Sequence, residues 1–155
     1  MGYLLDVNVL IALTDSNHEF HEAAWEWFLE RSSEVWATCP ITENGFVRIF
    51  GSPKYPNGPG SEEKARELLS QLRLVRGHKF LHDDISISNL SIFPDLRFSL
   101  SKNLTDLYLL GLAANHSCKF VSFDAGIPWT QIAGGGKFLK ILVGYRSSVN
   151  STGPS

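Results

Sequence analysis

The sequence predicts one α/β domain with a mainly parallel central sheet. Short apolar runs alternate with longer segments whose apolar residues recur at helical spacing, an order that favours strands joined by helices. The opening residues contain both patterns. Residues 3–5 are continuously apolar, as in a strand covered on both faces. After Asp6, the apolar residues Val9, Leu10 and Leu13 fall on one helical face.

Asp6 stands where this strand is expected to end and the helix to begin. In open α/β sheets, ligands bind outside the carboxyl ends of the strands. A carboxylate among apolar neighbours is costly to desolvate unless another group compensates, and a divalent cation is the obvious one. The position of Asp6 therefore raises the question of whether other acids join it.

The remaining elements follow in order along the chain. We expect strands at residues 35–38, 79–82, 119–122 and 138–143. We expect a first helix after Asp6 that ends between residues 14 and 17, and further helices at residues 18–31, 42–50, 61–74 and 105–115. Thr42, Ser61 and Thr105 are the expected helix caps. Residues 51–60 contain three prolines and three glycines, which predicts a loop. The Ser-rich residues 85–101 follow no clear period, and the sequence assigns them no role.

Length and composition limit the classes of protein that this chain can belong to. A chain of 155 residues suits one domain, and 43% apolar with 19% charged residues argues against disorder. The net charge of −2 excludes a generally basic surface for nucleic acids, so a polyanion would need a local basic patch or a bound cation. We expect one domain over residues 1–145, followed by a flexible, Ser-rich tail at residues 146–155.

The two cysteines and the apolar runs indicate the compartment. Cys39 and Cys118 lie in apolar contexts, which favours buried free thiols over a disulfide or a zinc site. Asp6 interrupts the N-terminal apolar run, so no signal peptide is visible. No apolar run reaches the ~20 residues that a membrane span needs. A cytoplasmic protein without membrane contact is the expectation.

Four acids stand at junctions between the expected elements. Asp6 and Asp124 follow strands, while Glu43 and Asp106 lie in the first turns of helices. Each has an ordinary explanation when taken alone. An acid in a first helical turn complements the helix dipole, and Asp124 precedes Ala125-Gly126, which is typical of a turn. Four such acids in one small α/β chain favour a shared site.

A shared site of carboxylates has a definite chemistry. Carboxylates that converge repel one another, and at least one then has a raised pKa. Mg²⁺ relieves the repulsion, takes oxygen ligands, and uses only one or two direct carboxylates while keeping several waters. Such an ion polarises a phosphoryl group and activates water, so these acids predict hydrolysis of phosphodiester bonds.

Four motifs together resemble the PIN-domain ribonucleases, and within them the VapC toxins of bacterial toxin–antitoxin pairs. They are LDVNVL from residue 5, TENGFVR from residue 42, TDLYLL from residue 105 and VSFD from residue 121. The run ATCPITE from residue 37 is particularly similar to the VapC subgroup. Each motif alone is weak, but all four occur in order, and the resemblance covers residues 4–143.

The resemblance implies a three-layer α/β/α fold and cleavage of RNA that depends on Mg²⁺, with Mn²⁺ as a substitute. The catalytic residues it implies are Asp6, Glu43, Asp106 and Asp124, and we assign Asp6, Asp106 and Asp124 to the metal. Asn8 and Ser122 match polar positions that support the acids. The resemblance also implies a homodimer and a cognate antitoxin. A catalytically inactive PIN-like module that binds RNA or protein remains the alternative.

Several other residues allow more than one interpretation. Arg48 and Lys54 are candidate RNA contacts, but Arg48 can equally form a salt bridge, and Lys54 can be ordinary solvated surface. His18 and His21 could bind a metal from one helix face, although a solvated or partly buried pair is the simpler reading. An aspartate phosphatase would need a second Asp at the position of Asn8.

The aromatic residues of two helices suggest how an antitoxin could bind. Trp25, Trp27 and Phe28 in one helix, and Phe46 and Phe50 in another, carry more aromatic bulk than a small core obviously needs. Part of this surface could form a groove for an antitoxin helix, with a basic residue of the antitoxin near the acids. The competing reading is that these rings fill the core.

Overall fold

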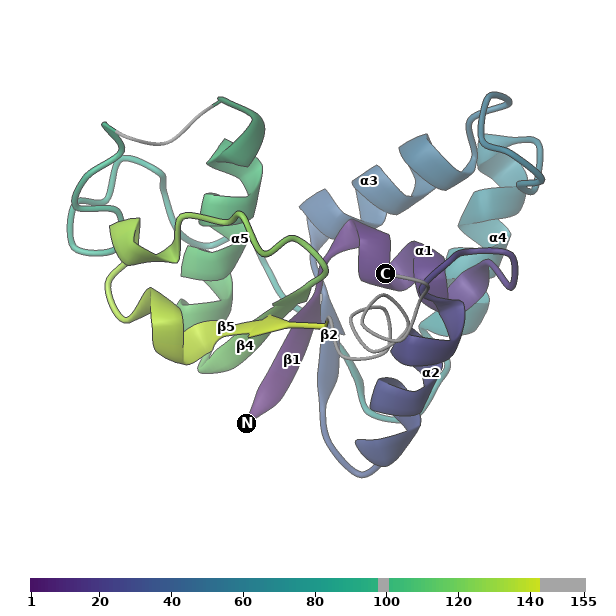
Figure 1. The fold of residues 1–155 in the computed structure, drawn as a ribbon, viewed down its shortest axis with the longest axis horizontal. Helices are drawn as coiled ribbons and strands as arrows, with labels where there is room; N and C mark the ends of the chain where they lie inside the picture. Colours follow the sequence, from purple (N-terminus) through teal and green to yellow (C-terminus); the bar gives the residue numbers. More distant parts are fainter. Residues whose placement is uncertain (98–100, 143–155) are drawn as a thin grey trace, which may run out of the picture.

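The computed structural model describes residues 1–97 and 101–142. Its centre is a sheet of five strands in the order β3-β2-β1-β4-β5, and every neighbouring pair is parallel. The strands are β1 (Gly2–Leu5), β2 (Trp36–Thr38), β3 (His78–Phe80), β4 (Cys118–Ser122) and β5 (Leu139–Ile141). The parallel sheet expected from the sequence is confirmed (Figure 1).

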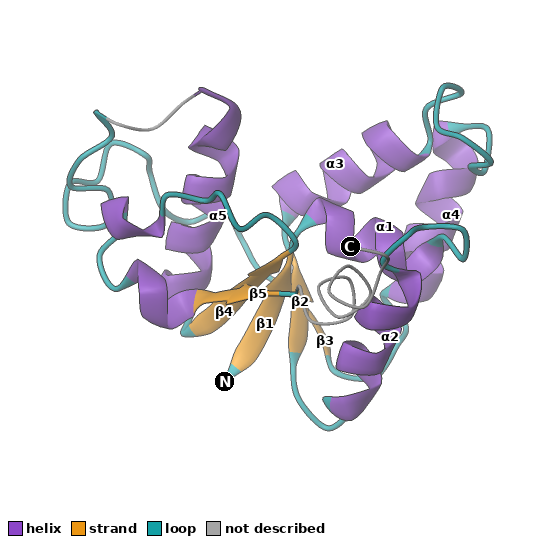
Figure 2. Cartoon of the chain, in the orientation of Figure 1, coloured by secondary structure: helices purple, strands orange, loops and turns teal. Residues whose placement is uncertain are grey.

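Helices cover both faces of this sheet, which confirms the three-layer α/β/α architecture (Figure 2). One layer contains α1 (Val7–Thr14), α2 (His21–Glu30), α3 (Pro40–Phe50) and α4 (Glu62–Leu72). The other contains α5 (Leu104–Asn115) and short 3-10 turns. The two central strands supply both cores, because successive side chains point to opposite faces. Leu5 and Val121 join the core under α1–α4, whereas Leu4 and Phe120 join the core under α5.

Two expected helix caps are wrong, and one is confirmed. The Ser61 hydroxyl accepts a hydrogen bond from the backbone N of Lys64 at 3.2 Å and begins α4. Helix α3 instead begins at Pro40, because proline suits the first helical position, and Thr42 is the third residue of its first turn. Helix α5 begins before Thr105, because a 3-10 turn at Ser101–Asn103 leads into it.

Other boundaries also differ from the expectation by a few residues. Helix α2 begins at His21 rather than residue 18, because residues 18–20 form a turn. Strand β3 ends at Phe80, before residue 82. Strand β5 begins one residue later than expected, because a 3-10 turn occupies Gly135–Phe138. Residue 143, the expected end of the last strand, lies outside the described residues.

The helix aromatics mostly fill the core. Trp27, Phe28, Phe46 and Phe50 are all buried in the core under α1–α4. The suggestion that these four rings line an open groove is therefore wrong. Trp25 is only half-buried, and its indole N–H donates to the carbonyl oxygen of Leu13 at 2.8 Å. It closes the end of α1, which explains why it lies off the apolar stripe of its own helix.

Tyr55 holds the loop at residues 51–60 against the rest of the domain through a hydrogen bond and a ring contact with Phe50. The Tyr55 hydroxyl donates to Asp15 Oδ2 at 2.7 Å, and Asp15 is only 8% exposed. Tyr55→Phe leaves Asp15 Oδ2 without its donor, while Oδ1 still accepts from the backbone N of Asn17. We therefore expect a loss of about 1–3 kcal/mol in the free energy of unfolding. Urea denaturation measures it. Tyr3→Phe is the control, because the Tyr3 hydroxyl makes no hydrogen bond with the described residues. Equal losses in the two variants would contradict this role for Tyr55.

The first part of the Ser-rich segment, residues 85–97, covers α5. Phe93 is 1% exposed, and its ring stacks on that of Tyr108 with centroids 6.2 Å apart. The Tyr108 hydroxyl donates to the carbonyl oxygen of Ile85 at 2.9 Å. Gly111 makes room for the ring, since a Cβ there would lie 2.6 Å from Phe93 Cζ. The segment is therefore part of the core under α5, and residues 98–100 lie outside the description.

Both cysteines are buried and free, as the sequence predicts. Within residues 1–97 and 101–142, no helix is both long and apolar enough to cross a membrane. The expected tail, residues 146–155, lies outside the described residues, so the domain boundary at residue 145 stays a prediction.

Candidate active site

Asp6 lies at the carboxyl end of β1 and is held by three neighbours. Its backbone N donates to the carbonyl oxygen of Val121 at 2.9 Å, which continues the pairing of β1 with β4. Its Oδ1 accepts from the backbone N of Val7 at 2.7 Å, at the start of α1. Its Oδ2 accepts from the Ser122 hydroxyl, also at 2.7 Å. The side chain is thus fixed in one orientation at the centre of the sheet edge.

The electrostatic surroundings of Asp6 favour its neutral form. The residue is only 7% exposed, and burial is the main cause that raises its pKa. The hydrogen bonds from Ser122 and Val7 act in the opposite direction, while repulsion from Asp124 raises the pKa further. Asp6 is therefore a carboxylate that gains from a nearby cation.

Asp106 is the acid of this group that has neither a hydrogen-bond donor nor a positive partner among the described residues. It lies half-buried in the first turn of α5, and its carboxylate accepts no hydrogen bond from any described residue. Burial, then repulsion from Asp6 and from Asp124, raises its pKa from the ordinary 3.8 to about 7. A simple helix-dipole role would lower the pKa instead. The side chain lacks a positive partner among the described residues.

Asp124 completes the group of three. It lies two residues beyond β4 and is exposed. Its backbone N donates to Ser122 Oγ at 3.1 Å, so one hydroxyl contacts both Asp6 and the backbone of Asp124. Its Oδ1 accepts from the backbone N of Gly126 at 2.8 Å, which is the expected turn. The turn and the group of acids coexist at this position.

Glu43, the fourth predicted acid, has partners of its own. Its Oε2 accepts from the Thr38 hydroxyl at 2.6 Å, and its Oε1 accepts from Arg73 Nη1 at 3.2 Å. Its side chain is 14% exposed. The structure therefore places Asp6, Asp106 and Asp124 in mutual repulsion, while the Glu43 carboxylate is paired with Thr38 and Arg73.

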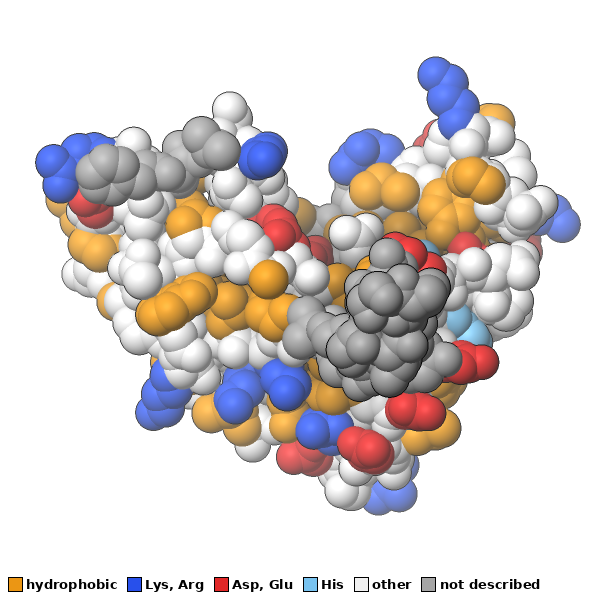
Figure 3. Space-filling view, in the orientation of Figure 1, with side chains coloured by type: hydrophobic (Ala, Val, Ile, Leu, Met, Phe, Trp, Pro, Cys, Tyr) orange, Lys and Arg blue, Asp and Glu red, His pale blue; other side chains and the backbone are white. Residues whose placement is uncertain are grey.

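The surface is hollowed at the end of the sheet where these acids gather. Figure 3 shows a notch between the parts of the molecule that carry α5 and α3, with Asp and Glu side chains on its walls. Lys and Arg side chains stand on both rims of the notch in this view. The arrangement suits an elongated polyanion whose phosphates lie along the rims and whose reacting group reaches the acids.

The chemistry of the three aspartates fits Mg²⁺, although they are not arranged as a closed metal cage. Among the described residues, no group of three or more His, Cys, Asp or Glu side chains is placed to hold an ion by itself. Mg²⁺ needs only one or two direct carboxylates, because water completes its octahedral shell. The carboxylate of Asp106, half-buried and without a donor among the described residues, is the observation that favours a cation here.

Several predicted positions make few contacts. Asn8 is exposed in the first turn of α1, and its side chain makes no hydrogen bond within the described part of the chain. Arg48 and Lys54 are exposed and form no ion pair with a described residue. The salt-bridge reading of Arg48 therefore finds no partner there. The roles of all three residues in RNA cleavage stay predictions.

The two histidines of the α1–α2 region serve the local backbone. His18 Nδ1 accepts a hydrogen bond from the backbone N of Phe20 at 3.0 Å. His21 Nδ1 lies 2.6 Å from the carbonyl oxygen of Ala12, which makes it the donor to the end of α1. The described residues place no metal-binding group at these histidines, so the partly buried reading holds.

Sequence reasoning missed the partners of Glu43. The sequence pattern presents Thr38 only as the last residue of a strand, and Arg73 as a candidate RNA contact or ordinary solvated surface. No motif singles out His78, whose Nε2 lies 2.8 Å from Thr38 Oγ1. The available signal was a buried-strand threonine five residues before the acid. The two other residues come from distant parts of the chain, where the sequence offers no such signal.

Comparison with known proteins agrees with this geometry. The family model described as "PIN domain" matches residues 3–133. Ribonuclease VapC44 of Mycobacterium tuberculosis is 42% identical over 137 residues, which cover 88% of this chain and 96% of the relative. Ribonuclease VapC38 of the same species is 42% identical over 126 residues, which cover 80% and 86%.

A solved structure has the same fold. The crystal structure of VapBC2 from Rickettsia felis, bound to a DNA fragment from their promoter, contains a chain that superposes with a TM-score of 0.58. The match covers 91% of this chain and 98% of that one, at 14% sequence identity. This structural match shows the fold alone, whereas the family model and the VapC relatives show the family. This chain belongs to the PIN-domain family, and its relatives within that family include VapC ribonucleases.

Proposed function

We propose that this protein is a metal-dependent endoribonuclease that acts as the toxin of a toxin–antitoxin pair in the cytoplasm. The relatives named ribonuclease VapC support the class of reaction and substrate. One observation of this chain carries the proposal: the half-buried Asp106 carboxylate has no donor among the described residues and is repelled by Asp6 and Asp124. Such a group of acids is unfavourable by itself and becomes favourable when it holds a divalent cation.

We assign the following roles to the residues of the site. Asp6, Asp106 and Asp124 hold Mg²⁺, for which Mn²⁺ substitutes. The Ser122 hydroxyl keeps Asp6 in place by donating a hydrogen bond to its Oδ2. The bound ion would polarise the scissile phosphate and lower the pKa of the attacking water. Glu43 is the remaining carboxylate and can accept a proton from that water.

RNA reaches these acids through the notch. Arg48 and Lys54 are exposed cations without ion-pair partners among the described residues, so they are available to phosphates. Asn8, exposed in the first turn of α1 next to Asp6, supports the ligands of the ion. Because the net charge of the protein is only −2, a few cations at the rim and the ion itself are enough to offset it locally.

Two protein partners belong to the same proposal. A cognate antitoxin blocks the site, which the kinship with VapC proteins supports. A second copy of the chain forms a homodimer. The exposed apolar side chains Leu104 and Trp129, on elements that contact each other beside the sheet, are available for such a contact. Light scattering on the purified protein measures the stoichiometry, and a monomer at micromolar concentration would contradict the dimer.

RNA cleavage under controlled metal concentration tests the proposed function. We expect the purified protein to cut single-stranded RNA with Mg²⁺ or Mn²⁺, to stop after EDTA, and to resume when Mg²⁺ is added in excess. Asp84→Asn is the matched control, because Asp84 is an exposed acid that pairs with His116 outside the group of three. Cleavage that survives EDTA would exclude the metal. RNA binding without cleavage would favour the inactive binding module.

A further inference from the structure

Glu43 belongs to a chain of four polar side chains that starts at the edge of the sheet. The chain joins His78 of β3, Thr38 of β2, Glu43 of α3 and Arg73, the residue that ends α4. Four different elements therefore meet at one carboxylate. Thr38 is fully buried, so water cannot take the place of either of its partners.

The directions of the hydrogen bonds follow from the count of protons. A threonine hydroxyl has one proton to donate, and an ionised carboxylate can only accept. The Thr38 proton therefore lies on the 2.6 Å bond to Glu43 Oε2. His78 Nε2, 2.8 Å from the same oxygen, must then be the donor. The arrangement fixes His78 in the Nε2–H form. The two hydrogen bonds then run in one direction, from His78 to Thr38 and from Thr38 to Glu43.

The neutral form of His78 agrees with this order. Burial, and then the positive charge of Arg73, lowers the pKa of His78 from 6.5 to about 4. The imidazole ring packs against Trp36, with ring centroids 4.7 Å apart, so its orientation is restricted. A neutral histidine held in this orientation donates a hydrogen bond from Nε2 to the Thr38 hydroxyl. The series of hydrogen bonds from His78 through Thr38 to Glu43 requires this donor.

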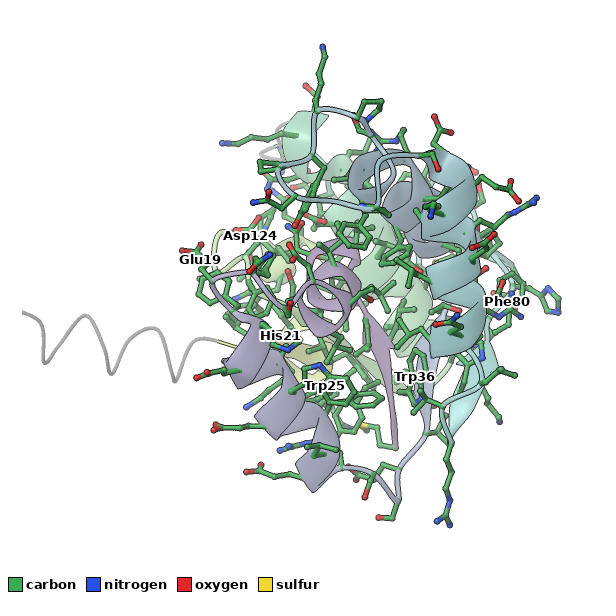
Figure 4. The ribbon with its side chains drawn as sticks, turned by 90° about the vertical axis from the view of Figure 1, so that its right-hand side faces the viewer. Glu19, His21, Trp25, Trp36, Phe80 and Asp124 are labelled. Atoms are coloured by element: carbon green, nitrogen blue, oxygen red, sulfur yellow. The ribbon has the colours of Figure 1, made fainter. Side chains whose placement is uncertain are left out.

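Arg73 fixes the other oxygen of Glu43. Its Nη1 donates to Oε1 at 3.2 Å, and its guanidinium lies over the Phe80 ring at 5.1 Å from the centroid. Figure 4 shows Phe80 beside α4, on the side of the molecule where the edge strand runs. The Phe80 ring limits the positions that the guanidinium can adopt. Both carboxylate oxygens of Glu43 thus have a donor.

The register of the edge strand β3 explains how this short strand supplies both His78, which contacts Thr38, and Phe80, which contacts Arg73. Strand β3 pairs with β2 so that His78 lies opposite Trp36 and Phe80 lies opposite Thr38. Residues two apart in a strand point to the same face. His78 therefore reaches Thr38, and Phe80 lies under Arg73, on the face that α4 covers.

We infer that Thr38, Arg73 and His78 are positioning residues for Glu43, and that they hold its carboxylate ready for RNA cleavage. The inference rests on the proposed function for the role of Glu43, but the contacts themselves do not. An exposed ion pair between Glu43 and Arg73 alone would contribute little. The buried Thr38 hydroxyl, which has a partner on each side, makes the arrangement specific.

Two substitutions of Thr38 separate positioning from simple packing. Thr38→Val removes the hydroxyl at nearly constant volume, and we expect kcat to fall about 10-fold while KM stays the same. Thr38→Ser keeps the hydroxyl, and we expect it to restore most of kcat although it loses a methyl group. A loss that Ser does not restore, or a loss confined to KM, would overturn the inference.

A second comparison uses two arginines of the α4 region and leaves the buried threonine intact. Arg73→Met removes the donor to Glu43 Oε1, and we expect a fall of several-fold in kcat. Arg66→Met is the control, because Arg66 forms an exposed pair with Glu63 on the same helix and contacts no predicted acid. Equal kcat values for the two variants would contradict a positioning role for Arg73.

A measurement without RNA distinguishes failure of this inference from failure of the proposed function. Long-range ¹H–¹⁵N NMR reports the protonated nitrogen of each histidine, and we expect His78 in the pure Nε2–H form at pH 7. His82, which makes no hydrogen bond with the described residues, is the reference within the same spectrum. A Nδ1–H or charged His78 overturns the inference even in an active nuclease. An inactive wild-type protein with Nε2–H His78 instead overturns the nuclease role and leaves the path to Glu43 intact.

Discussion

We expect Asp106→Asn to reduce kcat for RNA cleavage about 1,000-fold. Asparagine keeps the size of the side chain and the start of α5 but removes the charge that would hold the proposed cation. We expect weaker Mn²⁺ binding in the absence of RNA as well, measured by calorimetry. Cleavage at the wild-type rate with saturating Mg²⁺ would remove Asp106 from the site.

The same substitution stabilises the metal-free protein, and its pH dependence identifies the cause. The pKa of Asp106 is about 7 in the folded protein and 3.8 in its ordinary state. The folded state therefore retains a proton that the unfolded state releases, so the free energy of unfolding falls as pH rises from about 4 to 7. An asparagine side chain at this position has no such proton. At pH 8 we expect Asp106→Asn to be more stable by about 1–2 kcal/mol, a value discounted because solvent reaches part of the side chain.

Denaturation in EDTA at two pH values measures this difference. At pH 4, Asp106 is protonated in most folded molecules, so the wild-type protein and the variant should unfold at similar urea concentrations. At pH 8 the variant should unfold at the higher concentration. A gain in stability that is equal at both pH values would show that ionisation of the half-buried Asp106 among the other acids is not the cause.

Phe93→Ala has the largest expected effect on stability, a loss of about 3–5 kcal/mol in the free energy of unfolding. The ring is 1% exposed and fills the space that Gly111 leaves over α5, so its removal creates a cavity. Urea denaturation measures the loss. Leu90→Ala is the matched control, because Leu90 lies in the same segment but is 74% exposed, and we expect a change within about 0.5 kcal/mol. Similar losses in both variants would contradict the anchoring role of Phe93.

The sequence predicted the sheet well because its signal is local. A strand that is covered on both faces reads as an apolar run, so β1 and β4 were recognised without knowledge of their partners. Helix starts were harder to predict. Thr42 and Thr105 are both good caps in isolation, but Pro40 and a preceding 3-10 turn begin the helices earlier. The anchoring of residues 85–97 was invisible, because Phe93 is explained only by Gly111 and Tyr108 further along the chain.

In the candidate site, too, features with a local sequence signal were predictable, and contacts between distant residues were not. Asp6 and Asp124 were predictable as neighbours, because acids that follow parallel strands gather at one sheet edge. The hydroxyl of Ser122 was placed near them on its resemblance to the family motif, and it donates to Asp6. The partners of Glu43 were not predictable. Arg73 lies 30 residues after it, and His78 lies 40 residues after Thr38, so only the packing of α4 and β3 brings them together.

The hydrogen bond from Ser122 to Asp6 also bears on when the group of three aspartates can form. It joins residues that are 116 positions apart, near the two ends of the described chain. During synthesis on the ribosome, Asp6 emerges early but has neither Ser122 nor Asp124 beside it until β4 has left the exit tunnel. A nascent chain that stalls before β4 has emerged therefore lacks the assembled group of three aspartates.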